Sequence, residues 1–181
     1  MRRLRSLSRR GCGLILGAFL GLWVGAATAQ DCHRFVPGSL TQILAARQGK
    51  PLVLVLWSID CSACVSELGV LARSVQEHPG MDLVFVATDD TARAEEAQRV
   101  LSRHGLGDRE SWIFADTNRQ RLRYEIDPRW YGELPRSYFY DHNHRRVPLS
   151  GKLQQQHLER WAELIRAQPA SESSAKPPRD S

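Results

Sequence analysis

One segment constrains the fold of this chain more than any other. An apolar run over residues 51–57 is followed by the motif Cys61-Ser62-Ala63-Cys64. A continuous apolar run of this length is typical of a strand buried on both faces of a sheet. Apolar residues at helical spacing after the motif predict that it begins a helix, where backbone N–H groups and the helix dipole stabilise a thiolate. The second thiol lies one turn along, so the motif predicts a redox-active cysteine pair.

The cysteine pair has two other interpretations. A structural disulfide that closes so short a loop constrains the unfolded chain little, so it would stabilise the fold poorly. A zinc site needs four ligands. Cys32 and His33 could be offered as the other two, but adjacent residues at a flexible start rarely supply two tetrahedral ligands. We therefore favour redox chemistry and predict no metal ligands, with metal binding as the main alternative.

The N-terminus has the pattern of an export signal. An apolar stretch over residues 11–26 follows a basic one and precedes Ala27-Thr28-Ala29, an A-x-A cleavage signal. We predict a signal peptide over residues 1–29; the alternative is an uncleaved anchor, because about 18 apolar residues can just span a bilayer. Either way the remainder is exported to the periplasm, and an uncleaved segment would anchor it in the inner membrane. The basic residues of the signal are Arg2, Arg3, Arg5, Arg9 and Arg10.

The export signal changes how the net charge and the cysteines are interpreted. Residues 1–29 contain no acidic residue, and without their five arginines the basic and acidic residues are equal in number, so the formal charge of +5 does not indicate a nucleic-acid partner. Outside the cytoplasm Cys61 and Cys64 should rest as a disulfide. Cys12 belongs to the signal, which leaves Cys32 without an obvious partner. It is either a free thiol or forms a mixed disulfide or a transient bond with the motif.

The rest of the chain alternates between strand and helix patterns. We predict strands over 32–36, 51–57, 82–88, 111–115, 136–141 and 145–149, and helices over 39–47, 61–78, 91–104, 118–124 and 153–167. Ser39 is the expected N-cap of the first helix, and the last helix has an apolar face that includes Leu164. This order predicts one α/β domain over residues 30–167, with a central mixed sheet flanked by helices. The sheet should be mainly parallel with a C-terminal antiparallel hairpin, and residues 168–181 should be disordered.

This order of elements resembles the thioredoxin fold. Finer detail resembles exported TlpA-like thiol:disulfide oxidoreductases over residues 38–166. The matching features are Gly49-Lys50-Pro51, Trp57 four residues before the first cysteine, Glu67 three residues after the second, Arg103-His104-Gly105-Leu106, and Asp116. The resemblance implies dithiol/disulfide exchange on protein cysteines, with Cys61 as nucleophile and Cys64 resolving the mixed disulfide. It implies no dissociable cofactor, and it favours a reductase supplied by a membrane thiol reductant.

The resemblance also implies roles for residues around the cysteines. Leu134-Pro135 matches the position of a cis proline bond before the strand that faces the active site, where the preceding residue binds substrate backbone. A cis X–Pro bond costs only about 0.5–1 kcal/mol. Pro128 is a weaker candidate because no strand follows it. Trp57 should pack beside the disulfide. Glu67 either takes up protons near Cys64 or is a solvated acid on the helix face.

Two residues depart from the family pattern. Val55 stands where thioredoxin has a buried Asp beneath the cysteines. Asp60 precedes Cys61, where the family usually has an aromatic residue, and a carboxylate there should disfavour the thiolate. Asp60 could instead accept a proton locally or point into solvent.

Two further groups of residues are candidates for a role in the site. The segment 127–131 looks like an insertion, in which Trp130 and Tyr131 form either an apolar lip for a partner polypeptide or ordinary loop packing. His142 and His144 lie at the predicted hairpin turn. At about 3.3 Å per residue the turn is roughly 20 Å from the cysteines, so we do not expect these residues to bind metal.

Two other functions use the same fold. A copper-delivery module would bind Cu(I) through the reduced cysteines and a further His or Met. Only Met81 remains once the signal is removed, which counts against a methionine ligand. An envelope adaptor would keep the fold while its redox chemistry is incidental.

Overall fold

The computed structural model describes residues 31–167. The predicted signal peptide, its cleavage site, Cys12 and the predicted disordered tail lie outside the described residues. In the described part of the chain, no helix combines the length and apolar character that crossing a membrane requires.

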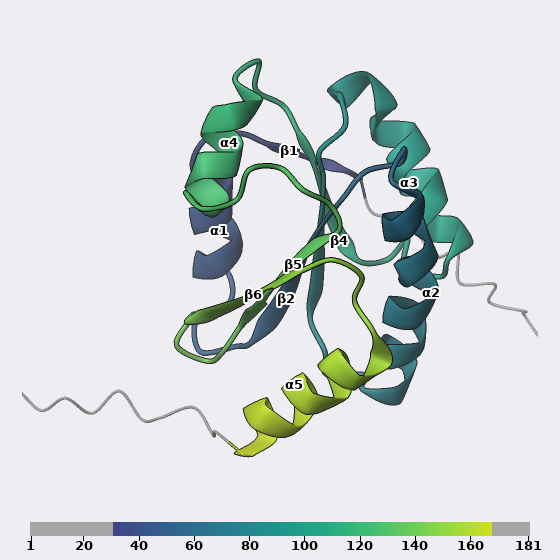
Figure 1. The fold of residues 1–181 in the computed structure, drawn as a ribbon, viewed down its shortest axis with the longest axis vertical. Coiled ribbons are helices and arrows are strands. Elements are labelled where there is room, and N and C mark those ends of the chain that lie inside the picture. The colour runs from purple at the N-terminus through teal and green to yellow at the C-terminus, as the bar shows by residue number, and fades with distance from the viewer. Residues whose placement is uncertain (1–30, 168–181) are drawn as a thin grey trace, which may run out of the picture.

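A six-stranded sheet forms the centre of the domain (Figure 1). Its strands are β1 (His33–Phe35), β2 (Leu52–Trp57), β3 (Leu83–Ala87), β4 (Glu110–Phe114), β5 (Arg136–Tyr140) and β6 (Arg146–Ser150). Their order across the sheet is β1-β4-β3-β2-β5-β6. The first four strands in this order (β1, β4, β3 and β2) pair in parallel, whereas β5 pairs antiparallel with both β2 and β6. The mixed sheet with a C-terminal antiparallel hairpin is therefore confirmed.

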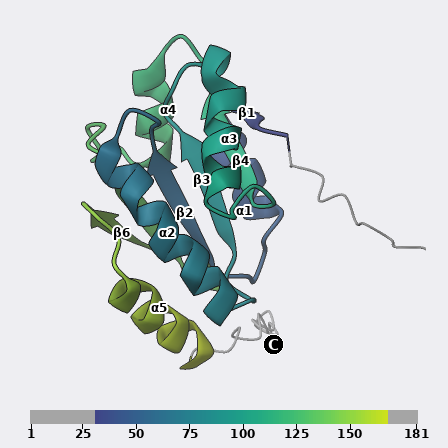
Figure 2. The ribbon, with the colours of Figure 1, turned by 90° about the vertical axis from the view of Figure 1, so that its right-hand side faces the viewer.

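Helices cover both faces of this sheet, as Figures 1 and 2 show. They are α1 (Ser39–Ala45), α2 (Ser62–Glu77), α3 (Ala94–Arg103), α4 (Arg119–Ile126) and α5 (Gln155–Ala167), with a 3₁₀ turn η1 (Thr91–Arg93) before α3. One core lies between the sheet and α2, α3 and α5, and the other lies between the sheet and α1 and α4.

Strand β2 connects the two cores. Val53, Val55 and Trp57 contribute to the core beneath α2. The intervening Leu52, Leu54 and Leu56 contribute to the core beneath α1 and α4. All six side chains are buried, and burying each stabilises the fold by about 1.5–3 kcal/mol. This two-sided burial explains why the run is continuously apolar instead of alternating.

Most element boundaries match the prediction within a few residues, with two corrections. Gly38, in a left-handed conformation with φ of +91°, is the N-cap of α1 in place of Ser39. The Ser39 hydroxyl instead accepts a hydrogen bond from the Val36 N–H at 2.9 Å, so it stabilises the preceding turn. Leu164, expected on the buried face of α5, is about half exposed.

Candidate active site

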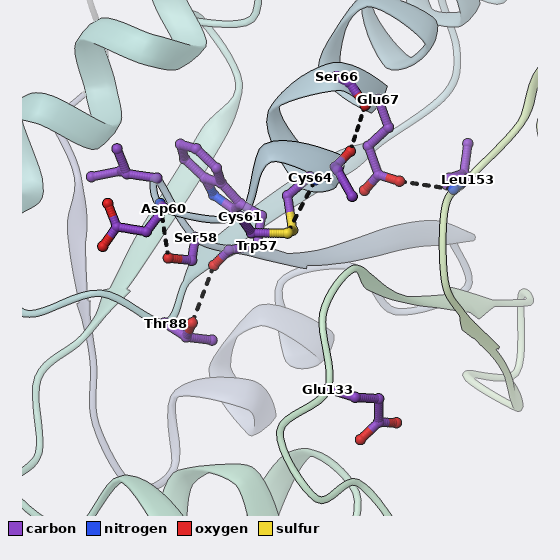
Figure 3. The surroundings of a disulfide bond; sticks show 12 residues. Trp57, Ser58, Asp60, Cys61, Cys64, Ser66, Glu67, Thr88, Glu133 and Leu153 are labelled. Atoms are coloured by element: carbon purple, nitrogen blue, oxygen red, sulfur yellow. Dashed lines mark hydrogen bonds between the residues drawn. A yellow bond between two sulfur atoms is a disulfide. The ribbon is translucent and has the colours of Figure 1, made fainter.

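Cys61 and Cys64 form a disulfide at the start of α2, with their Cα atoms 5.2 Å apart. Cys61 is the N-cap of the helix, and its sulfur accepts a hydrogen bond from the Cys64 N–H at 3.1 Å (Figure 3). The same N–H would stabilise a Cys61 thiolate after reduction. Cys64 is fully buried, whereas Cys61 is partly exposed. The sulfur of Cys61 is therefore the one that a partner can reach.

Strand β2 and the turn after it fix the position of Cys61. Trp57, the last residue of β2, is buried in the same core as Cys64, and its carbonyl accepts a hydrogen bond from the Thr88 N–H at 2.9 Å. The chain then turns, and the Cys61 N–H donates to the Ser58 carbonyl at 3.1 Å. The predicted packing of Trp57 beside the disulfide is consistent with this arrangement. Its contribution to substrate binding stays a prediction.

The Leu134-Pro135 bond is cis, as predicted. Pro135 directly precedes β5, and the register pairs Arg136 with Leu56. Pro135 therefore lies at the edge of the sheet where β2 ends and the cysteine motif begins. Leu134 is partly buried and packs against both cores. This placement suits the predicted backbone contact with a substrate, which stays a prediction.

Glu67 is fully buried one turn beyond Cys64 on α2. One carboxylate oxygen accepts a hydrogen bond from the Leu153 N–H at 2.8 Å (Figure 3), and the other has no hydrogen-bond partner among the described residues. Burial raises the pKa of Glu67 to about 7, although the Leu153 N–H and the charge of Lys152 partly oppose that rise. A solvated acid on the helix face is therefore the wrong interpretation. The carboxyl group can gain or lose a proton near neutral pH.

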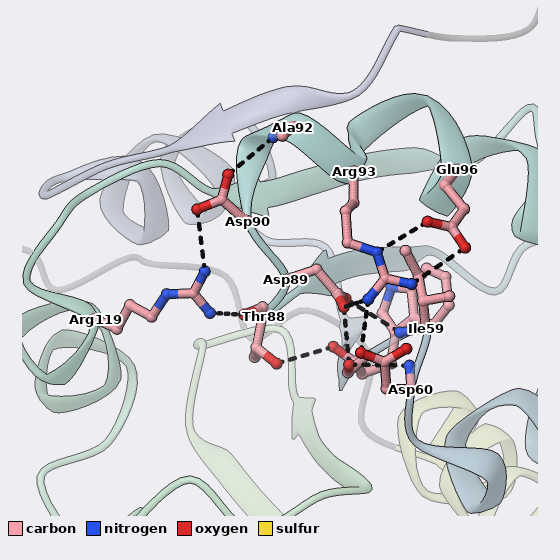
Figure 4. Close-up of polar contacts among 11 residues, drawn as sticks. Ile59, Asp60, Thr88, Asp89, Asp90, Ala92, Arg93, Glu96 and Arg119 are labelled. Carbon is pink, nitrogen blue, oxygen red and sulfur yellow. Dashed lines mark hydrogen bonds and ion pairs between the residues drawn. The ribbon is translucent and has the colours of Figure 1, made fainter.

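Asp60 forms an ion pair with Arg93, a contact that the sequence did not indicate. Its side chain is 75% exposed and forms an ion pair with Arg93, the two charged groups being 2.6 Å apart (Figure 4). Figure 3 shows the Asp60 side chain pointing away from the sulfur atoms. Its predicted part in proton transfer has no contact that supports it and stays a prediction. Val55 is fully buried in the core beneath α2, so no carboxylate occupies that position.

The hairpin histidines bind main-chain carbonyl groups. The ring nitrogens of His142 lie 2.9 Å from the Gly49 oxygen and 3.2 Å from the Ile165 oxygen. Nε2 of His144 lies 2.8 Å from the Arg47 oxygen. The described residues contain no group of three or more His, Cys, Asp or Glu that could hold a metal ion. Both histidines therefore attach the hairpin turn to neighbouring elements.

Cys32 lies far from the disulfide. The register runs from His33 through Trp112 and Val86 to Leu56, so Cys32 is three strands away from β2. At about 4.8 Å per strand this is roughly 14 Å. A disulfide needs Cα atoms within about 7 Å. Cys32 is a free cysteine whose pKa is raised by burial, and a bond between it and the motif is incompatible with this fold.

The segment before Pro135 is held by a charged cluster that the sequence did not reveal. Asp127 is fully buried and accepts hydrogen bonds from Arg136 and Arg146, each at 3.2 Å, and from the Tyr138 hydroxyl at 3.1 Å. Burial by itself would raise the pKa of Asp127, but the Arg129 N–H and the charge of Arg146 outweigh it, so the pKa is lowered. The partners lie 9 to 19 residues along the chain, on β5 and β6, which is why no local pattern indicated them.

Trp130 and Tyr131 do not act together as a lip. Trp130 is buried in the core beneath α1 and α4, and its indole N–H donates to the Glu133 carbonyl at 2.8 Å. It is therefore ordinary packing. Tyr131 is 89% exposed.

Comparison with solved structures identifies the fold. A secreted disulfide oxidoreductase of Mycobacterium tuberculosis, homologous to Escherichia coli DsbE, matches with a TM-score of 0.54 and 22% identity, covering 66% of this chain and 85% of that one. A secreted thiol-disulfide isomerase of Corynebacterium glutamicum matches with a TM-score of 0.55 and 18% identity, covering 69% and 75%.

A thioredoxin-family thiol:disulfide interchange protein of Chlorobium tepidum matches with a TM-score of 0.54 and 15% identity, covering 67% and 83%. No protein-family model matches the sequence, and no curated protein matches it. The predicted fold is confirmed: the chain has a thioredoxin-like fold with its disulfide at the start of α2.

Proposed function

We propose that this protein is an exported thiol:disulfide oxidoreductase that acts on protein cysteines through Cys61 and Cys64. The observation that carries the proposal is the asymmetry of the disulfide: Cys61 is partly exposed at a helix N-terminus, and Cys64 is buried behind it. The similar structures are named as a disulfide oxidoreductase, a thiol:disulfide interchange protein and a thiol-disulfide isomerase, and this supports the same chemistry here. Their secreted members, together with the basic-apolar N-terminal segment, support export.

As a reductant, the protein begins with both cysteines reduced. The Cys61 thiolate attacks one sulfur of a partner's disulfide, the partner's S–S bond breaks, and the partner's second sulfur leaves as a thiolate that takes up a proton. The product is a mixed disulfide between Cys61 and the partner. Cys64 then loses its proton and attacks the Cys61 sulfur, which releases the partner's first sulfur as a second thiol. Two electrons pass from the dithiol to the partner, and the Cys61–Cys64 disulfide re-forms.

Glu67 is the group that we assign to the proton on Cys64. A buried thiol needs a nearby base to become a nucleophile, and a carboxylate with a pKa of about 7 is partly ionised at neutral pH. Figure 3 shows its carboxylate between the start of α2 and Leu153. The oxygen without a partner among the described residues is free to accept this proton.

The direction proposed is reduction. The resemblance to TlpA-like proteins favours it, and a reductase in an oxidising compartment needs an electron donor, for which a membrane-embedded thiol reductant is the chemical class. The helix N-terminus and the Cys64 N–H stabilise the Cys61 thiolate. The extent of this stabilisation contributes to the reduction potential of the cysteine pair.

Trapping a mixed disulfide tests the exchange chemistry. The Cys64→Ser variant, made in a Cys12→Ser/Cys32→Ser background, should accumulate a mixed disulfide with a disulfide-containing protein such as insulin, visible on a non-reducing gel. The matched Cys61→Ser variant should form none. The wild type should also accelerate the reduction of insulin by dithiothreitol. An equal yield of mixed disulfide from both variants, or no acceleration, would contradict the proposal.

A further inference from the structure

A buried carboxylate, that of Asp89, binds the turn that presents Cys61. Asp89 follows β3 and is almost fully buried. Its oxygens accept hydrogen bonds from the Ser58 hydroxyl at 2.9 Å and from the Ile59 N–H at 3.1 Å. These contacts hold two of the three residues between β2 and Cys61. Asp89 therefore determines where the nucleophile's turn lies relative to the sheet.

Arg93, in the turn η1, joins this carboxylate to two others (Figure 4). Its guanidinium lies 3.3 Å from Asp89, 2.6 Å from Asp60 and 2.9 Å from Glu96. The planar fork of an arginine suits such multiple contacts because its donors point in fixed directions. Arg93 thereby connects the residue directly before Cys61 to an element 33 residues further along the chain.

The charges around Cys61 give this contact a chemical consequence. The acidic groups are Asp60 on the turn itself, Asp89 after β3, Glu96 on α3, Glu67 on α2 and Glu133 in the loop before Leu134 (Figures 3 and 4). Arg93 is the cation that contacts the first three. A neighbouring carboxylate disfavours a thiolate. An Asp60 side chain released from Arg93 could turn toward the sulfur and weaken the nucleophile.

We propose that Arg93 is a positioning residue of the thiol site, which holds the Asp60 carboxylate away from Cys61 and, with Asp89, fixes the turn that presents the nucleophile. This inference rests on the proposed function, because only a reactive Cys61 benefits from it. It explains how an acid is tolerated directly before the cysteine, where the family resemblance leads one to expect an aromatic residue.

A double-mutant cycle on the reactivity of Cys61 tests the proposal. In a Cys12→Ser/Cys32→Ser/Cys64→Ser background, Cys61 is the single thiol of the chain, and its alkylation rate is measured against pH on the full chain. At pH values below the thiol's pKa, Arg93→Gln should lower the alkylation rate about two- to fivefold, which is the range expected for an exposed ion pair. Asp60→Asn should change the rate little while Arg93 is present, and should restore it in the Arg93→Gln variant.

Two variants separate this role from a general effect on folding. Arg93→Lys keeps the cation and should retain most of the reactivity. Arg99→Gln, on α3, removes the exposed ion pair to Glu95 and should leave the rate unchanged. An Arg93→Gln variant that unfolds would leave the comparison of Arg93→Lys with Asp60→Asn/Arg93→Lys, in which the cycle predicts the same rescue on a smaller scale.

The proposal is overturned if Asp60→Asn changes the rate equally with and without Arg93, or if Arg93→Gln leaves the rate unchanged in a folded protein. Alkylation needs no partner disulfide. A protein that fails to exchange disulfides would therefore still give a readable result, so failure of the proposed function and failure of this inference are distinguishable.

Discussion

Two buried carboxylates in this protein have opposite surroundings. Glu67 lies behind the disulfide, with one N–H as its hydrogen-bond partner and one oxygen without any among the described residues. Asp127 lies at the start of the loop that leads to Pro135, where it accepts hydrogen bonds from Arg136, Arg146 and Tyr138. The pKa of Glu67 is raised to about 7, whereas the pKa of Asp127 is lowered.

The comparison shows that burial alone does not decide what an acid does. Both side chains are removed from water, which disfavours the charged form. At Asp127 the Arg129 N–H, the charge of Arg146 and the Tyr138 hydroxyl compensate for the loss of water, so the carboxylate stays ionised and holds the loop in place. At Glu67 little compensation exists, so the group exchanges a proton near neutral pH. One acid stabilises the structure and the other is suited to chemistry.

Removing the charge of Asp127 should have the largest effect. Asp127→Asn leaves Arg136 and Arg146 without their shared partner, and breaking a buried ion pair in this way costs about 3–5 kcal/mol. Urea unfolding of the oxidised protein measures the loss. The matched control is Arg129→Gln, at a side chain 83% exposed, which should change the free energy of unfolding by less than about 0.5 kcal/mol. A loss below about 1 kcal/mol for Asp127→Asn would show that the cluster does not anchor the loop.

Glu67 should make stability fall as pH rises. The folded protein holds the Glu67 proton up to about pH 7, whereas the unfolded chain releases it near 4.5, so stability is greatest below 4.5 and is lost through about pH 7. The expected loss is on the order of 3 kcal/mol, since each pKa unit corresponds to about 1.4 kcal/mol. Urea unfolding at a series of pH values measures it.

Two comparisons make the stability profile specific. Glu67→Gln should remove this part of the pH dependence. Asp127, with its lowered pKa, should contribute no slope in this range, because its stabilisation is lost only as pH falls below its unfolded value and through its lower folded value. Identical profiles for the wild type and Glu67→Gln would show that Glu67 does not hold a proton at these pH values.

The exchange reaction should depend on Glu67 as well. Without a base near Cys64, the mixed disulfide should resolve about 100-fold more slowly at pH 7, at the lower end of what a positioned acid or base contributes. Rapid-quench trapping of the mixed disulfide in Glu67→Gln measures this step. The initial attack by Cys61 should be nearly unchanged. A loss confined to the first step would place Glu67 elsewhere in the reaction.

The smallest effect should come from the hydroxyl beside Asp127. Tyr138→Phe removes one hydrogen bond to a carboxylate that keeps both guanidinium partners, so the expected cost is about 1–2 kcal/mol. Thermal unfolding of the oxidised protein is the measurement. A cost equal to that of Asp127→Asn would mean that Tyr138, and not the ion pairs, holds the cluster together.

Local patterns were enough to predict the elements that form the fold. The apolar run of β2, the cysteine motif at the start of α2 and the hairpin of β5 and β6 depend on nearby residues, and each is present. The cis bond at Pro135 was also predicted, through the family resemblance.

Contacts between residues far apart in the chain determine the features that could not be predicted from the sequence. Glu67 is buried because the chain returns at Leu153, 86 residues later, and Asp60 forms an ion pair with Arg93, 33 residues away. Neither contact leaves a periodic signal. Gly38, the N-cap of α1, donates its backbone N–H to the carboxylate of Glu125, 87 residues along the chain, and this contact too leaves no local signal.

The reduction potential of the purified protein tests the central claim most directly. Equilibration in glutathione or dithiothreitol buffers, followed by alkylation of free thiols, should reveal a reversible two-electron couple that disappears in Cys61→Ser. For a reductase the value should lie near roughly −250 mV, and a value near about −120 mV would indicate an oxidase using the same chemistry. The absence of any reversible couple, with Cys61 and Cys64 both intact and reactive, would contradict the account.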